Sequence, residues 1–268
     1  MANPLQVKVI AHARIKTDKR DSRALAQLLR ANLIPEVYQR EAGNREAQRV
    51  LRLRAFWISL KVQVQNKIRA LLAQQSEEVR LAIEQLDRRL FGRQGQELLG
   101  SLELGERDRE ILRALLKGYR TFEAFLKETD GLVATLYRQS PAAQLIDTAP
   151  GFAQTFSVLV AVEIADVRRF PRAEALSAYA GLIPSTYSSG ERTFHGPIVK
   201  GNTWLRWALI EAVQPAIRKD PSLAILYYRL ARRKGPNVAK VATARRLLTI
   251  LYHMLKENRA YRMNPTAA

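Results

Sequence analysis

Apolar residues recur every three or four positions along most of this chain, which is the spacing of one face of an α-helix. Two long tracts show the pattern clearly. The first runs through Leu53, Phe56, Leu60, Val64, Ile68 and Leu71. The second runs through Leu112, Leu115, Tyr119, Phe122 and Leu126, in the alternating steps of a heptad. The sequence therefore predicts a mainly α-helical protein in which residues 45–140 form two long helical arms.

Four glycines, Gly92, Gly95, Gly100 and Gly105, interrupt the chain between the two arms. Such breaks are typical of a connection that lets two helices fold back as an antiparallel hairpin. The apolar seam of each arm has two interpretations. It can pair with the arms of another copy, or it can be covered inside one chain as a helical bundle. The seam spacing is compatible with both.

The first thirty residues combine a strand pattern with a helix pattern. Residues 5–10 alternate in the manner of a strand, and residues 17–30 carry leucines on one helical face. Asp18 and Asp21 are three apart at the start of this helix, so their side chains project in similar directions. They are candidate ligands for Mg²⁺, which prefers oxygen donors. Residue chemistry alone favours the simpler interpretation, in which they cap the helix and complement its positive end.

Residues 145–182 are expected to form a compact helical unit with a turn at Pro150-Gly151. A turn of this kind between helices resembles a helix-hairpin-helix, whose main-chain amides bind phosphate without reading sequence. The alternative is a turn that only packs, because Ala153 stands where a second glycine would allow close approach. Arg168 and Arg169 lie near this turn, either as a nucleic-acid contact or as a solvated basic face.

The most informative stretch is residues 179–192, YAGLIPSTYSSGER, in which an apolar helix end breaks at Gly181 and Pro184 into a polar loop. A serine hydroxyl beside a glycine, in a positive field, is what attack on a phosphodiester requires. Cations that provide such a field follow at Arg192, Lys200 and Arg206. A serine-rich and glycine-rich surface turn is the alternative interpretation.

The charge of the whole chain narrows its possible partners. The chain has 268 residues and a formal net charge of +19, and its last sixty residues are helical in pattern and rich in arginine and lysine. This excess favours a nucleic-acid partner first and an anionic membrane surface second. The cations expected to contact nucleic acid are Lys16, Arg168, Arg169, Arg192, Lys200, Arg206, Arg232, Arg233 and Lys234.

Other bulk features exclude several classes of protein. The chain has no cysteine, and its three histidines are widely separated, so disulfides and a zinc site are not expected. It has no apolar run long enough to span a bilayer. Its first residues lack the pattern of a signal peptide, so we expect a cytoplasmic protein.

The stretch YAGLIPSTYSSGERT, followed by KGNTWLRWAL, resembles the C-terminal domain of bacterial insertion-sequence transposases related to the Piv site-specific invertase, which are RNA-bridged DNA recombinases. The resemblance implies that Ser189, directly before the loop glycine, is the nucleophile, with Ser188 beside it. It also implies DNA and a structured guide RNA as partners, and a homo-oligomer, a dimer or tetramer, held by the coiled-coil arms.

The same family opens with a ribonuclease-H-like (RuvC-like) α/β domain that carries four metal-binding acids. The stretch KTDKRDSR resembles the end of that domain, so the resemblance implies that Asp18 and Asp21 are the last two acids and that Mg²⁺ is the cofactor. The first two acids sit in "GID" and "EATG" contexts, and neither occurs here. About a hundred residues of the usual N-terminus are thus expected to be absent.

The expected organisation is therefore a partial RuvC-like domain at 1–44, coiled-coil arms at 45–140, and a helical transposase domain with a helix-hairpin-helix-like unit at 141–268. The expected function is a DNA transposase that cuts and rejoins DNA through Ser189, assisted by acids and magnesium. The alternative is a truncated remnant that binds DNA or RNA without catalysis, because two acids alone hold magnesium weakly.

Overall fold

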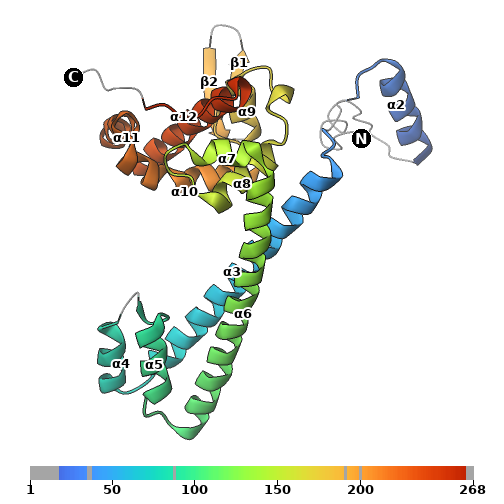
Figure 1. Cartoon of the computed structure of the whole chain (residues 1–268). Coiled ribbons are helices and arrows are strands. Elements are labelled where there is room, and N and C mark those ends of the chain that lie inside the picture. The colour runs from blue at the N-terminus through green and yellow to red at the C-terminus, as the bar shows by residue number, and fades with distance from the viewer. Residues whose placement is uncertain (1–17, 35–37, 87–88, 190–191, 199–200, 264–268) are drawn as a thin grey trace. The chain divides into compact units, whose positions relative to one another are not determined.

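The computed structural model describes residues 18–34, 38–86, 89–189, 192–198 and 201–263 (Figure 1). These residues are mainly helical, as the periodicity predicts. The chain divides into two units, Met1–Arg45 and Glu46–Ala268, which are described separately. Among the described residues, none of the helices has both the length and the apolar character needed to cross a membrane.

Among the described residues of the first unit, α2 spans Asp18–Arg30, and α3 begins at Ala42. Asp18 and Asp21 lie in its first turn, where carboxylates complement the positive end of a helix. No residue of α2 is buried, and Leu29 on its apolar face is 69% exposed. The strand expected at residues 5–10 and the cation Lys16 lie outside the described residues, and the RuvC-like origin of this unit stays a prediction.

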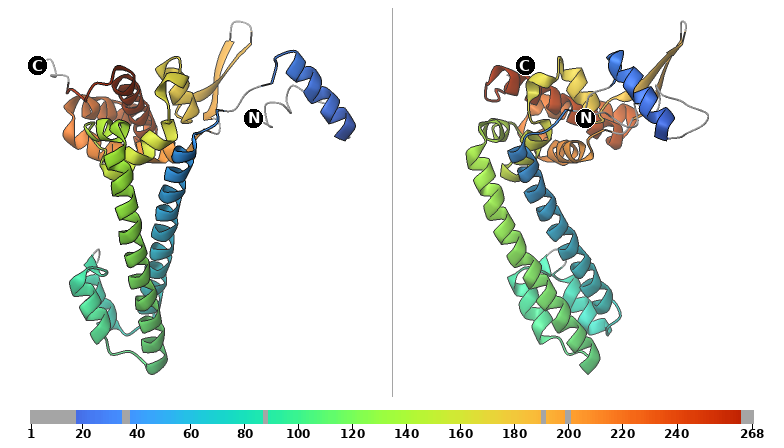
Figure 2. Two further views of the ribbon diagram at one scale, coloured as in Figure 1. Left: turned by 45° about the vertical axis from the view of Figure 1, so that its right-hand side comes forward. Right: turned by 90° about the vertical axis from the view of Figure 1, so that its right-hand side faces the viewer.

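The two predicted arms are α3, Ala42–Leu72, and α6, Glu106–Gln139, which run side by side in the views of Figure 2. Trp57 of α3 packs against Phe122 and Phe125 of α6, with ring centroids 6.1 and 4.9 Å away. An ion pair of 2.9 Å joins Lys61 to Glu123 across the same interface. The arms therefore cover part of their seam within one chain, while Leu53 and Phe56 stay exposed. Pairing with a second copy stays a prediction.

The connection between the arms is more structured than the glycines suggest, because it contains α4, Glu77–Glu84, and α5, Arg93–Ser101. Gly95 lies in the first turn of α5, where a Cβ would come within 2.0 Å of the carbonyl oxygen of Leu90. Only glycine fits such an approach without a shift of the main chain. The end of the arms has its own core, made of Ile68, Leu72, Val79, Leu90, Phe91, Leu99, Leu104, Leu112, Leu116 and Tyr119.

The remaining helices form one body with α8, Gln154–Ile164, which packs against α6, α7 and α10 and in which every residue from Ser157 to Ile164 is buried. A helix that is apolar on all sides belongs in the centre of a fold. The body also contains α7 at Pro141–Asp147, the 3₁₀ turn η2 at Val167–Arg169, α9 at Ala173–Tyr179, α10 at Thr203–Lys219, α11 at Pro221–Lys234 and α12 at Pro236–Glu257. This core also includes Ala47 and Leu51 of α3, so the arm and the body share buried residues.

The turn at Gly151 fits the packing interpretation of the sequence. Gly151 has φ of +90°, and a Cβ there would lie 2.2 Å from the carbonyl oxygen of Ala212 in α10. The close approach that this glycine allows is therefore to a neighbouring helix. The helix-hairpin-helix pattern is present as α7, the turn and α8, and in the structure it buries Phe152.

The polar loop expected after Pro184 is instead a β-hairpin. Strand β1, Pro184–Ser189, pairs antiparallel with β2, Arg192–Ile198. The strands contain Thr186, Tyr187, Thr193, Phe194 and Ile198, which are residue types that favour extended main chain. Both strands are short and polar, so their alternation gives a weak signal in the sequence.

Candidate functional site

The hairpin carries the serine pair that the sequence singled out. Ser189 is the last residue of β1 and pairs with Arg192, the first residue of β2, while Ser188 pairs with Thr193. The candidate nucleophile therefore lies at the end of the hairpin that is distant from the helices. The position of Ser189 relative to the helices depends on how the base of the hairpin is held. We call this base, where Gly181 and Gly201 meet, the stem.

Two glycines hold the stem together. A Cβ on Gly201 would lie 2.4 Å from the amide nitrogen of Gly181, and Gly181 itself has φ of +67°. No other residue type fits this contact without displacing main chain. Gly181 ends the segment before β1, and Gly201 begins the segment after β2. Their contact brings the two ends of the hairpin segment together at the surface of the helical body.

Asn202, directly after this contact, joins the stem to the body. Its main-chain amide donates to the carbonyl oxygen of Tyr179 at 2.8 Å. Its side-chain oxygen accepts from the amides of Trp204 and Leu205 at 3.1 and 3.0 Å, which caps the N-terminus of α10. Its side-chain nitrogen donates to the Tyr179 hydroxyl at 3.1 Å and to a carboxylate oxygen of Glu163 at 2.7 Å.

Glu163 is a carboxylate inside the apolar core of the body, with 1% of its surface exposed. In addition to Asn202, it accepts from Gln48 at 3.2 Å and forms an ion pair with Arg52. Both partners belong to α3, more than a hundred residues earlier in the chain. A buried charge is tolerated only when it is paired and hydrogen-bonded, so these contacts are needed for the fold. Glu163 thus links the arm to the stem of the hairpin.

Arginine guanidinium groups stack on aromatic rings on both sides of this network. The guanidinium carbon of Arg52 lies 3.8 Å from the ring centroid of Trp204, at the start of α10. That of Arg169 lies 4.2 Å from Phe170 and 4.5 Å from Tyr179. Cation–π contacts of this kind fix the orientation of the rings and of the charges. Arginines and aromatic residues therefore pack together beside the base of the hairpin.

The structure places the candidate nucleic-acid cations in three kinds of surroundings. Arg169 is engaged in packing, and its Nε donates to the carbonyl oxygen of Ile164 at 3.1 Å. Arg168 is exposed and pairs with Asp166 at 3.0 Å, and its hydrogen bonds hold the pKa of the Asp166 carboxyl below its ordinary value. Arg206 lies at the stem, because a Cβ on Gly181 would approach its Nη1 at 3.2 Å.

The remaining cations are separate from the stem or outside the described side chains. Arg232, Arg233 and Lys234 are exposed in the last turn of α11, where cations also complement the negative end of the helix. Arg192 is placed by its main chain at the start of β2. Lys16 and Lys200 lie outside the described residues.

Asp18 and Asp21 do not make a complete magnesium site with the residues that the structure describes. Both are exposed on α2, and no group of three or more potential metal ligands occurs in the described part of the chain. Two carboxylates leave most of the octahedral coordination of Mg²⁺ to water. No chemical step is therefore assigned to a metal here.

Sequence reasoning missed Glu163, Gln48 and Arg52. One signal was available, because Glu163 interrupts an apolar run from Phe156 to Ile164. An acid in the middle of a helix that is otherwise apolar on all sides needs a buried partner. The identity of those partners was not accessible, since Gln48 and Arg52 come from a distant part of the chain.

Comparison with known proteins relates the chain to mobile genetic elements. Residues 143–229 match the family described as "Transposase IS116/IS110/IS902 family". The chain is 24% identical over 257 residues to the transposase for insertion sequence element IS1111A of Coxiella burnetii, covering 92% of the chain and 68% of that protein. It is 30% identical over 132 residues to the 43.6 kDa protein of insertion element IS110 of Streptomyces coelicolor, covering 48% of the chain and 32% of that protein.

A third relative is the 42 kDa protein of insertion element IS900 of Mycobacterium paratuberculosis, 28% identical over 163 residues, with 59% of the chain and 40% of that protein covered. The chain thus spans about two thirds of the first relative and less than half of the other two. The matched residues 143–229 contain Glu163, the hairpin and Asn202. The comparisons therefore relate this chain to the insertion-sequence transposases of the IS116/IS110/IS902 family, through the segment that holds the serine hairpin.

Proposed function

We propose that this chain acts as a DNA transposase in which Ser189 is the nucleophile. The observation that supports this most is the stem of the hairpin, where Gly181, Gly201 and Asn202 fix the segment that presents Ser189. A nucleophile must be held in place relative to its substrate, because misplacement by even 1 Å lowers the rate strongly. The similarity of residues 143–229 to insertion-sequence transposases points to DNA as the substrate.

In the proposed reaction the Ser189 hydroxyl oxygen bonds to a DNA phosphorus, and the bond from that phosphorus to a deoxyribose oxygen breaks. The hydroxyl loses its proton, and the departing oxygen gains one. Attack of a different deoxyribose hydroxyl on the phosphoserine releases the serine and joins the new strand. Arg192, which pairs with Ser189 at the start of β2, is the cation proposed to neutralise the attacked phosphate. Arg206 lies at the stem, at the other end of the hairpin, and is proposed to contact a different phosphate of the DNA.

The proposal extends to a structured RNA as the element that selects the DNA target. The chain carries a net charge of +19, which suits sequence-independent contact with phosphates. Arg232, Arg233 and Lys234 are exposed in the last turn of α11 and are proposed as part of this surface. Magnesium bound by Asp18 and Asp21, together with further acids, stays an expectation of the family resemblance.

The test is covalent capture of DNA on the protein, measured as a labelled adduct that survives denaturation. We expect Ser189→Ala to abolish the adduct and Ser188→Ala, the matched neighbour, to retain it. The assay is run with and without magnesium and a candidate guide RNA from the same element. An adduct that persists in Ser189→Ala but disappears in Ser188→Ala would reassign the nucleophile to Ser188. If both variants retain the adduct, catalysis by either serine is refuted.

A second candidate function is binding of nucleic acid without strand cleavage. The observation that favours it is the exposed pair Asp18 and Asp21, which has no third acidic partner within the described part of the chain. Salt titration distinguishes binding from chemistry, since the affinity for a DNA duplex should fall linearly with the logarithm of salt concentration. Steep salt dependence without any adduct under all conditions would support this second function.

A further inference from the structure

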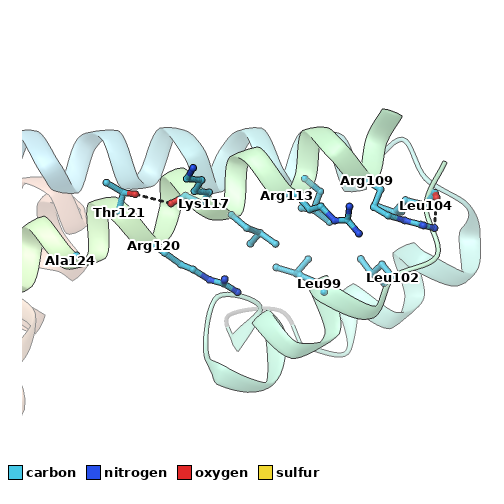
Figure 3. Close-up of a pocket in the computed structure, with 12 residues that line it drawn as sticks. Leu99, Leu102, Leu104, Arg109, Arg113, Lys117, Arg120, Thr121 and Ala124 are labelled. Carbon is cyan, nitrogen blue, oxygen red and sulfur yellow. Dashed lines mark hydrogen bonds between the residues drawn. The ribbon is translucent and has the colours of Figure 1, made fainter. Parts of the chain in front are cut away.

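The end of the arms contains a groove of about 680 Å³ between α5 and α6 (Figure 3). Five leucines line it: Leu99, Leu102, Leu104, Leu112 and Leu116. These leucines belong to the small core at the end of the arms, so the groove has a fixed floor. Gly100 also lines the groove on the α5 side, and a Cβ at this position would meet nothing within 4 Å.

One edge of the groove is a row of four cations on α6. Arg109, Arg113, Lys117 and Arg120 follow one another in steps of four, four and three residues, and all four line the groove. At 1.5 Å per residue the row extends about 16 Å along the helix. Figure 3 shows Arg113 and Arg120 on the α6 side of Leu99. Among the residues that the structure describes, no aspartate or glutamate lines the groove.

The cations of this row form no ion pairs in the described part of the chain, although Glu106 and Glu110 precede Arg109 and Arg113 by three residues. Arg109 donates to the carbonyl oxygen of Leu104 at 3.0 Å, and none of the four cations has an ion pair with a described acid. Glu123, the acid of α6 nearest to Arg120 in sequence on its C-terminal side, pairs instead with Lys61. Like charges three or four residues apart destabilise a helix by about 0.2–0.5 kcal/mol per pair. An anionic partner would remove this repulsion.

The floor of the groove indicates which anion fits. Nucleic-acid bases gain most from stacking on aromatic rings, and none of the described residues that line this groove is aromatic. Leucines instead favour apolar side chains, at about 25 cal/mol per Å² of apolar surface removed from water. A helix with leucines on one face and carboxylates beside them has the same 1.5 Å rise as α6, so its acids can match the cation row position by position.

We propose that this groove is the docking site for an acidic amphipathic helix of a partner protein. The partner helix lies along α6 with its apolar face on the leucine floor, and its carboxylates pair with Arg113, Lys117 and Arg120. This interaction is separate from strand transfer, so the proposal stands or falls independently of the role of Ser189.

The probe is a fluorescent helical peptide of about 18 residues, long enough for five turns, with leucines on one face and glutamates elsewhere. A second peptide has the same composition, with the leucines distributed so that no apolar face forms. We expect the first peptide to bind the full chain at least about tenfold more tightly than the second, because only the first can bury its leucines on the floor of the groove. Equal affinity for the two peptides would overturn the proposal.

Two pairs of substitutions with the same change in net charge localise the binding. Arg113→Glu with Lys117→Glu reverses two charges at the groove, and Lys67→Glu with Arg138→Glu reverses two exposed charges that do not line it. We expect the first pair to weaken peptide binding at least about tenfold and the second less than about twofold. Circular dichroism verifies that both remain folded. Equal losses of peptide affinity in the two double variants would show that binding depends on net charge alone. That result would refute the groove as the binding site.

Two further outcomes would assign the groove to another occupant and overturn the proposal. One is that a duplex RNA displaces the peptide and loses its own affinity in the Arg113→Glu, Lys117→Glu protein, which would make this a nucleic-acid surface. The other is that the same substitutions convert a self-associated protein to monomer in sedimentation, which would make the groove an interface between copies.

Discussion

At the scale of single residues, Asn202 combines two roles that can be separated experimentally. Its side-chain oxygen caps α10, and its side-chain nitrogen donates to Glu163 and Tyr179. A cap contributes typically about 1 kcal/mol. Loss of a donor to a buried charged group costs about 1–3 kcal/mol. Because Asn202 lies directly after the stem glycine, the second role also determines how firmly the hairpin is attached.

We predict that Asn202→Ser lowers the free energy of unfolding by about 1–3 kcal/mol, since serine keeps the cap but cannot reach Glu163 as a donor. Asn202→Ala should cost about 1 kcal/mol more, because it removes the cap as well. Urea denaturation of the three proteins measures both differences, and hydrogen exchange at β1 and β2 reports the stem. Thr203→Ala, at the adjacent exposed position, is the control. If serine and alanine are equally destabilising, Asn202 does not act through its cap.

At the scale of elements, the arms show which predictions local sequence can support. The seam spacing correctly predicts two long helices, because helical periodicity depends on neighbouring residues alone. It misidentifies part of the buried face, since Leu53 and Phe56 are 40% and 51% exposed while Leu51 and Leu72 are buried. Which face becomes buried is decided by packing against α6 and the body, and that information is not local.

The hairpin and the Glu163 network show the other limit. The sequence locates the serine stretch but predicts a loop, because two short polar strands pair only once both are held at their stem. The contacts of Glu163 with Gln48 and Arg52 join positions more than a hundred residues apart. Neither arrangement leaves a pattern that can be recognised in a single sequence. Helix caps do leave one, because Ser140, Asn202 and Asp220 are residue types that favour helix starts.

Self-association of the arms is predicted to depend on the exposed apolar residues of α3. Leu53→Glu with Phe56→Glu should shift the protein toward monomer in analytical ultracentrifugation without unfolding it, because both side chains are 40% or more exposed. Phe122→Asp, in contrast, places a charge against Trp57 and should destabilise the arm itself. A monomer for the unaltered protein would contradict the predicted homo-oligomer, and an unchanged oligomer in the double variant would place its interface elsewhere.

At the scale of the whole molecule, Tyr261 near the C-terminus forms hydrogen bonds with residues from two distant parts of the chain. The Tyr261 hydroxyl donates to Asp220, the N-cap of α11, and the Tyr261 amide donates to the Thr148 hydroxyl at 3.0 Å. Burial and the bond to Asp220 raise the pKa of Tyr261. Burial alone would raise the pKa of Asp220, but hydrogen bonds from Tyr261, Ser222 and Leu223 outweigh it and lower the pKa. The carboxylate is therefore the form that the fold stabilises.

The contact between Gly181 and Gly201 has a consequence for chain connectivity. When two ends of a segment already touch, the entropy of closing a loop between them changes only slowly with the length of that loop. Replacing residues 184–199 with a short Gly/Ser linker, while keeping the buried Leu182, should therefore leave the thermal midpoint within a few degrees of the parent. Salt-dependent DNA binding should remain, and the covalent adduct should be lost. A collapse of the thermal midpoint would mean that the hairpin stabilises the helices. The expected result would make the serine hairpin an excisable insert in a domain that folds without it.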